Sequence, residues 1–138
     1  MKKYSLFLIF LILASCSKDK DVEPVGANFK LEFSQTGGYS KYFRFMGLDP
    51  VVVFEGTNVA PLTLEGKDLK DEKYSFVTSK PIQMFSPSFI VSSSDADSSA
   101  VFTFRVFRNG ELIDTKVIEA GANDPTPKNY SWDYKSND

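Results

Sequence analysis

The sequence contains no histidine and only one cysteine among its 138 residues. Histidine is the commonest general base and the commonest transition-metal ligand, so its absence excludes Ser-His-Asp catalysis and histidine-bound metals. The glycine-rich phosphate loops of standard spacing are also missing. The acidic residues fall in apparent loops, and no pattern sets two of them across a cleft. We therefore predict no catalytic residue, no metal site and no cofactor, with carboxylate-only catalysis as the less favoured alternative.

The chain also lacks an excess of basic residues and a membrane-spanning hydrophobic run. Lys and Arg number 16 against 18 Asp and Glu. A nucleic-acid surface calls for a basic stripe, so we predict no nucleic-acid partner. The unbroken apolar run from Leu6 to Leu13 is far shorter than the stretch of about 20 residues that spans a bilayer core.

That short run has the position and flanks of a signal peptide. Lys2 and Lys3 form a charged start, the apolar run follows, and small residues come next. The segment Leu13-Ala14-Ser15-Cys16 resembles the bacterial lipoprotein signal, L-[AS]-[SGA]-C. The resemblance implies a thioether-linked diacylglycerol on Cys16, cleavage before it, and acylation of its amino group by a chain such as palmitate. The alternative is an ordinary cleaved signal peptide with an incidental cysteine.

The residues after Cys16 predict a tether. Ser17 to Asp21 and the following residues through Gly26 are too polar to bury a core. A serine after the cysteine resembles outer-membrane sorting, and the charged string with Asp19 and Asp21 is similar to the surface-export tag of Bacteroidota-type lipoproteins. Several lipid chains anchor a protein stably. We therefore expect a cell-envelope protein on the outer membrane. If the charged string acts as an export tag, the protein is exposed on the cell surface; the alternative is that the string is a tether alone.

The expected organisation has three parts: a signal peptide over 1–15, the lipidated cysteine and tether over 16–27, and one domain over 28–138. With Lys2 and Lys3 removed, the mature chain has 14 basic residues against 18 acidic ones. Lipidation consumes the only cysteine, so the domain must be held by its hydrophobic core. Eleven of the 13 phenylalanines lie in this part, and each buried ring contributes roughly 1.5–3 kcal/mol.

The domain alternates apolar and polar residues with a period of two, which predicts β-strands. Gly and Pro separate the runs. The expected strands cover 29–33, 42–46, 51–54, 74–78, 89–92, 100–107, 112–119 and 130–134, and 62–64 is a further short candidate. The segment 66–73 is expected mainly as a loop. Short strands with frequent turns are typical of an all-β fold, here a small antiparallel β-sandwich of about seven or eight strands.

Asn109-Gly110 is the strongest local signal, because a two-residue type I′ hairpin requires positive φ at both positions. A continuous register around this turn pairs Phe104 with Thr115 and Phe102 with Val117. It also places two opposite-charge pairs in register, which stabilises a hairpin. We predict a core face that bears Phe102, Phe104, Val106, Ile113 and Val117.

The layout of the mature chain resembles a diffuse group of small secreted β-sandwich proteins, the MmpS-like lipoproteins. The shared features are an early alternating strand, a Tyr74-Ser75-Phe76 strand after a mid-chain loop, and the late hairpin. The resemblance implies a fold and a location and brings no catalytic residues. The expected role is therefore noncatalytic binding of an envelope protein or glycan. The alternative is an accessory subunit that joins an outer-membrane assembly through a strand edge.

Two segments invite sharper hypotheses. Tyr130, Trp132 and Tyr134 form either an aromatic platform for a ligand or one face of a strand that packs on the core. The polar stretch from Ser92 to Ser99 either presents Asp95 and Asp97 to calcium, a cation that prefers oxygen ligands, or is a flexible loop. Core packing and a plain loop are the favoured interpretations.

Overall fold

The computed structural model describes residues 25–93, 97–122 and 124–137. Cys16 and the rest of the predicted lipobox lie outside these residues, as do Asp19, Asp21 and Asp95. The division of the chain into signal, tether and domain therefore remains a prediction.

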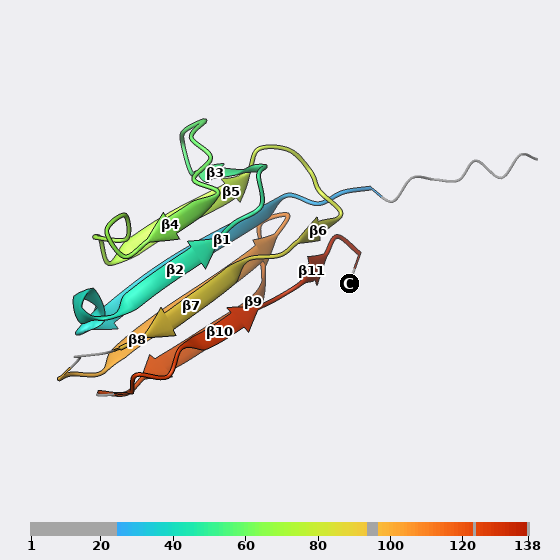
Figure 1. Cartoon of the computed structure of the whole chain (residues 1–138). Coiled ribbons are helices and arrows are strands. Elements are labelled where there is room, and N and C mark those ends of the chain that lie inside the picture. Colours follow the sequence, from blue (N-terminus) through green and yellow to red (C-terminus); the bar gives the residue numbers. More distant parts are fainter. Residues whose placement is uncertain (1–24, 94–96, 123, 138) are drawn as a thin grey trace, which may run out of the picture.

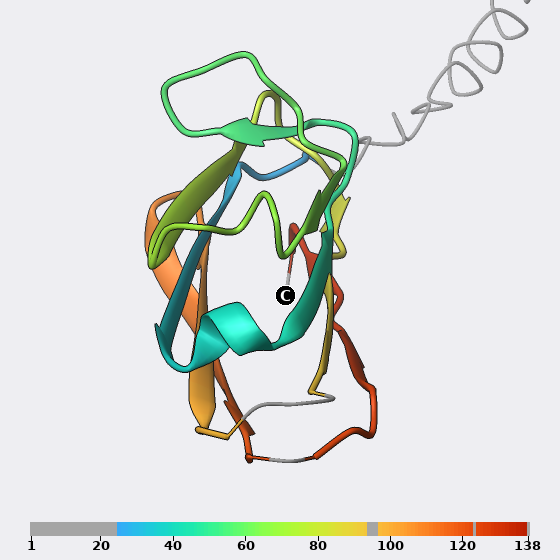
Figure 2. The ribbon, with the colours of Figure 1, turned by 60° about the vertical axis from the view of Figure 1, so that its left-hand side comes forward.

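The described chain is a β-sandwich of two antiparallel sheets, which Figures 1 and 2 show as two facing layers. The first sheet has the order β3-β5-β1-β8-β9, and the second β10-β7-β2-β4. The strands are β1 Phe29–Gly37, β2 Phe43–Gly47, β3 Val52–Phe54, β4 Thr63–Glu65, β5 Lys73–Thr78, β6 Met84–Phe85, β7 Ser88–Ser92, β8 Ala100–Arg108, β9 Glu111–Ala120, β10 Lys128–Ser131 and β11 Tyr134–Lys135. The predicted fold class is confirmed.

The number of strands exceeds the prediction, because two very short strands pair outside the main sheets. β6 and β11 form a two-stranded ladder of their own. The predicted strand over 130–134 is accordingly split between β10 and β11. The only helical element described is a 3-10 turn, η1 Tyr39–Lys41. No helix in the described part of the chain could span a membrane.

Aromatic rings fill the space between the sheets. Phe33 of β1 is 1% exposed, and its ring centroid lies 4.9 Å from that of Phe104 on β8 and 5.7 Å from that of Phe89 on β7. β1 and β8 belong to the first sheet and β7 to the second, so the contact between Phe33 and Phe89 joins the two layers. Alternation in the sequence places the rings inward, because successive side chains of a strand point to opposite faces.

The late hairpin has the predicted turn but a different register. Asn109 and Gly110 have φ of 51° and 87°, as a type I′ turn requires. Near the turn Phe107 pairs with Leu112 as predicted, but a bulge follows, and beyond it Phe104 pairs with Lys116. One extra residue, Ile113, is thereby accommodated on β9.

Because of the bulge, the predicted core face of β9 is wrong beyond Ile113. Past an inserted residue every side chain turns to the opposite face of the strand. Val117, predicted inside, is therefore 57% exposed, and Ile118 is 4% exposed in its place. On β8 the prediction is confirmed, since Phe102, Phe104 and Val106 are all buried.

Candidate functional site

The loops at one end of the sandwich meet around the hydroxyl of Tyr42, and we call this place the loop junction. The Oη atom lies 2.9 Å from the carbonyl oxygen of Ser98, 3.1 Å from that of Ala120 and 3.0 Å from that of Gly121. Ser98 belongs to the loop after β7, and Gly121 to the loop after β9. A hydroxyl has one hydrogen to donate, so the junction holds more acceptor oxygens than Tyr42 can satisfy.

Two carboxylates flank the loop junction, one from each loop. Asp97 forms an ion pair with Lys41, and Asp124 forms one with Lys128 at 2.8 Å. The hydrogen bond from Lys41 lowers the pKa of Asp97, and that from Lys128 lowers the pKa of Asp124. Both groups therefore stay ionised at neutral pH.

The loop junction lies at the end of the sandwich opposite the start of the described chain. Ala27, just before β1, bridges to Ile82 at one end, whereas Gly38, just after β1, donates its amide hydrogen to Ser99 at the other. The nine residues of β1 separate these points, which corresponds to about 30 Å at about 3.3 Å per residue. Figure 2 shows the two ends. A tether attached before β1 would hold the loop junction away from its anchor.

The donor set of the loop junction consists of hard oxygens, the ligands that Ca²⁺ prefers. Among the described residues, however, no three Asp, Glu, His or Cys side chains come together as a group that could hold a metal ion. The available set is thus two carboxylates and several backbone carbonyls. Asp95 and Asp97 are the candidate calcium ligands of the sequence analysis. Asp97 lies in a loop that reaches the loop junction, and Asp95 lies outside the described residues.

A buried arginine supports the neighbouring loop over 66–71. Arg44 of β2 is 3% exposed and carries no carboxylate partner among the described residues. Its Nη1 donates to Gln35 Oε1 at 2.6 Å and to the carbonyl oxygen of Leu69 at 2.8 Å, and its Nη2 donates to that of Gly66 at 3.1 Å. Burial lowers the pKa of Arg44, but arginine stays protonated in proteins. The guanidinium therefore holds this loop from inside.

The predicted aromatic platform packs partly against the core. The Trp132 ring centroid lies 5.1 Å from that of Phe104, and Tyr130 stacks on Trp132 at 6.0 Å. The Tyr134 hydroxyl donates to Asp114 Oδ2 at 3.0 Å, and burial together with this bond raises the pKa of Tyr134. All three rings are half-buried, so each keeps some surface toward solvent. Ligand binding by these rings remains a prediction.

The sequence signals for this region were incomplete. Asp97 was found from its polar loop, but Tyr42 and Asp124 are distant in sequence and carried no motif. Arg44 alternated with Phe43 and Phe45, and nothing in that pattern marked it as the buried member.

The comparisons with known proteins give a family and a fold. A family model described as PLAT/LH2 and C2-like Ca²⁺-binding lipoprotein matches residues 1–125. The fold is similar to that of a protein from Parabacteroides distasonis solved by NMR in its calcium-bound form, with 16% identity, a TM-score of 0.61, and coverage of 82% of this chain and 98% of that one. No curated protein matches the chain.

Two crystal structures of domains of unknown function show the same fold. The DUF4425 domain from Bacteroides vulgatus is 13% identical, with a TM-score of 0.66 and coverage of 80% of this chain and 96% of that one. The DUF4425 protein from Bacteroides ovatus is 11% identical, with a TM-score of 0.61 and coverage of 82% and 98%.

Proposed function

The chain belongs to the family of PLAT/LH2 and C2-like Ca²⁺-binding lipoproteins, and on this premise we propose that it is a noncatalytic binding module anchored to the cell envelope through Cys16. The family match confirms the predicted lipoprotein class and points to a non-enzymatic module. It does not test Cys16, the outer membrane, the surface tag or the resemblance to MmpS-like lipoproteins, which stay predictions. The observation that carries the proposal is the match itself, which spans residues 1–125 and so covers the predicted lipobox and most of the domain.

Replacing Cys16 with alanine should abolish membrane attachment, because the thioether cannot form without the thiol. We expect the variant to leave the membrane fraction of cells, and wild-type protein to show an acylated Cys16 as its first residue by mass spectrometry. Ser17→Ala is the matched control and should remain in the membrane fraction. A wild-type chain that starts at Met1, or one with a free thiol in the soluble fraction, would contradict the anchor.

Calcium binding at the loop junction is the second part of the proposed function. It is supported by the family description and by the excess of carbonyl oxygens around Tyr42. Asp97 and Asp124 would supply the carboxylates, each of them leaving its lysine. Few carboxylates and two competing ammonium groups favour weak binding, and extracellular calcium modules bind with dissociation constants of about 10⁻⁴–10⁻³ M.

Titrating the lipoprotein in detergent micelles with Ca²⁺, followed by calorimetry, tests this site. We expect saturation in the millimolar range or just below it, and at least a tenfold loss of affinity for Asp97→Asn combined with Asp124→Asn. Asp133→Asn is the control, since this exposed carboxylate lies beyond β10, away from the loop junction. Calcium binding that survives the double replacement would place the ion elsewhere, and no heat at millimolar Ca²⁺ would remove calcium from the proposed function.

Strand addition to an outer-membrane assembly is the alternative function. The longest edge strand among the described sheets is β9, which bears the bulge near Ile113 and charged side chains such as Lys116 and Glu119. Bulges and charges on an edge hinder pairing with a further strand. The loops are therefore favoured over the strand edge as the binding surface.

A further inference from the structure

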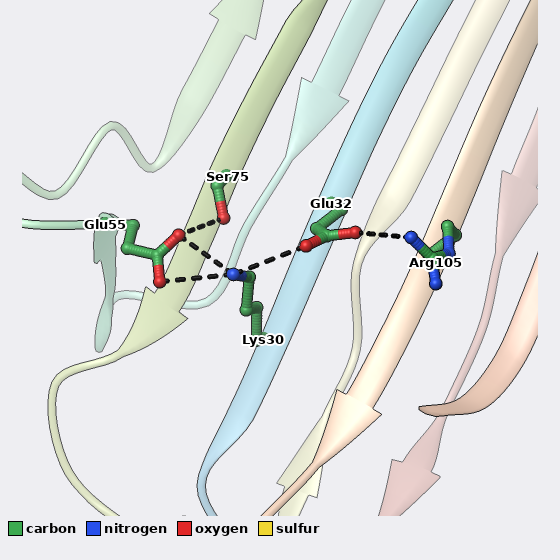
Figure 3. Close-up of polar contacts among 5 residues, drawn as sticks. All are labelled: Lys30, Glu32, Glu55, Ser75 and Arg105. Carbon is green, nitrogen blue, oxygen red and sulfur yellow. Dashed lines mark hydrogen bonds and ion pairs between the residues drawn. The ribbon is translucent and has the colours of Figure 1, made fainter. Parts of the chain in front are cut away.

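A groove of about 520 Å³ runs across the outer face of the five-stranded sheet, away from the loop junction and the aromatic core. Its lining comes from β1, β5 and β8 and from the residue after β3 (Figure 3). Ligand pockets have volumes of about 300–1,000 Å³. The groove thus has room for one or two sugar rings, and neither the anchor nor the proposed calcium site uses it.

Polar contacts connect the walls of the groove in one line. Ser75 Oγ donates to Glu55 Oε2 at 2.6 Å, and the Lys30 ammonium lies 3.0 Å from Glu55 Oε2 and 3.3 Å from Glu32 Oε1. Arg105 Nη1 lies 3.0 Å from Glu32 Oε2. We call these five residues the charge ladder, which Figure 3 shows with alternating signs.

The strand register builds the charge ladder. Glu32 on β1 lies directly opposite Ser75 on β5 and Arg105 on β8, so the three side chains share one face. The ladder side chains of Lys30, Glu32 and Arg105 are between 32% and 48% exposed. Ion pairs between side chains with this degree of exposure contribute little to stability. Their effect is to hold donors and acceptors in fixed positions, which lowers the entropic cost of binding a ligand.

The groove has one more cation than the ladder neutralises. Lys73 of β5 lies opposite Ser34 of β1, and its ammonium makes no ion pair with any described residue. The guanidinium of Arg105 uses Nη1 for Glu32, stacks over the Phe107 ring at 5.1 Å, and keeps further N–H donors. Three cations thus face two carboxylates, with the Ser34 hydroxyl between the strands of Lys73 and Arg105.

We propose that this groove binds an acidic saccharide whose carboxylate is held by Arg105 and Lys73 and whose hydroxyl groups donate to Glu32 and Glu55. A single negative charge matches the surplus of one cation. A phosphate dianion would meet the two carboxylates, and an apolar peptide would find charged and hydroxyl side chains instead of apolar pockets. Sugar hydroxyls both donate and accept, as the alternating ladder requires.

The test is a calorimetric titration of the lipoprotein in detergent micelles with galacturonic acid, which carries a single carboxylate, with neutral galactose and with inorganic phosphate. We expect saturable binding of the acidic sugar only. Lys73→Ala and Arg105→Ala should each weaken it by about tenfold, since hydrogen bonds to charged groups are worth that much. Lys80→Ala, an exposed lysine outside the groove, is the matched control and should bind like the wild type.

Lys73→Ala keeps the test independent of folding, because this side chain has no ion pair to lose. The proposal is overturned if the acidic sugar does not bind, if the neutral sugar binds equally well, if phosphate binds as tightly, or if Lys80→Ala reduces binding as much as Lys73→Ala does. The proposal does not rest on calcium binding. Retained sugar binding in the Asp97→Asn, Asp124→Asn protein is expected, and loss of sugar binding there would place the sugar site at the loop junction instead.

Discussion

Replacing Phe104 with alanine is expected to lower the free energy of unfolding by about 3–5 kcal/mol, the range for a fully buried phenylalanine. Phe104 is 1% exposed, and its ring centroid lies 4.9 Å from that of Phe33, 5.0 Å from that of Phe89 and 5.1 Å from that of Trp132. The loss would leave a cavity among rings from both sheets. Domains are stable by only about 5–15 kcal/mol, so a large share of the stability would be removed.

Urea denaturation followed by tryptophan fluorescence measures this effect, with an unchanged slope expected if the native state stays compact. Ile118→Ala and Val117→Ala are a matched pair of neighbours on β9, of which only Ile118 is buried. We expect the free energy of unfolding to fall by about 2–4 kcal/mol for Ile118→Ala and by about 0.5 kcal/mol for Val117→Ala. The opposite order would show that the bulge is absent and that the continuous register is correct.

In the late hairpin, the local sequence pattern predicted the turn but not the strand register. Asn109-Gly110 fixed the turn, because few other dipeptides adopt positive φ at both positions. Arg108 still lies opposite Glu111, but beyond the bulge Arg105 lies opposite Thr115 and not opposite Asp114 as the predicted register required. Arg105 instead contacts Glu32 on β1, a strand more than 70 residues away in sequence. The sequence of the two hairpin strands carries no signal of the third strand, β1, which competes for the Arg105 side chain.

The candidate site was less predictable than the fold for the same reason. Alternation and turn residues are local, and they were enough to predict a sandwich. The loop junction instead joins Tyr42 to Ser98 and Gly121, which are 56 and 79 residues away. The groove likewise depends on which strands become neighbours, because Lys73 and Arg105 come near each other only through β1. Neither arrangement leaves a spacing motif in the sequence.

The second large effect is expected at Arg44, where replacement by methionine should lower the free energy of unfolding by about 2–4 kcal/mol. Methionine has a similar length but no donor, so Gln35 Oε1 and the carbonyl oxygens of Leu69 and Tyr42 would lose hydrogen bonds in or near the core. Each unsatisfied buried acceptor costs about 1–3 kcal/mol, less where water can enter. Urea denaturation gives the free energy, and amide exchange over 66–71 should accelerate as that loop loses its inner support.

Lys41→Met is the matched control, because it removes the same kind of charge from an exposed ion pair and should cost at most about 1 kcal/mol. Equal costs for the two replacements would mean that water solvates the Arg44 site. The double replacement Arg44→Met with Gln35→Met separates the remaining possibilities. Removing both partners leaves fewer unsatisfied groups than removing one, so the double variant should be more stable than the two single costs predict, by about 0.5–3 kcal/mol. Strict additivity would show that Arg44 and Gln35 support the loop independently, without the shared bond at 2.6 Å that joins β1 to β2 across the sandwich.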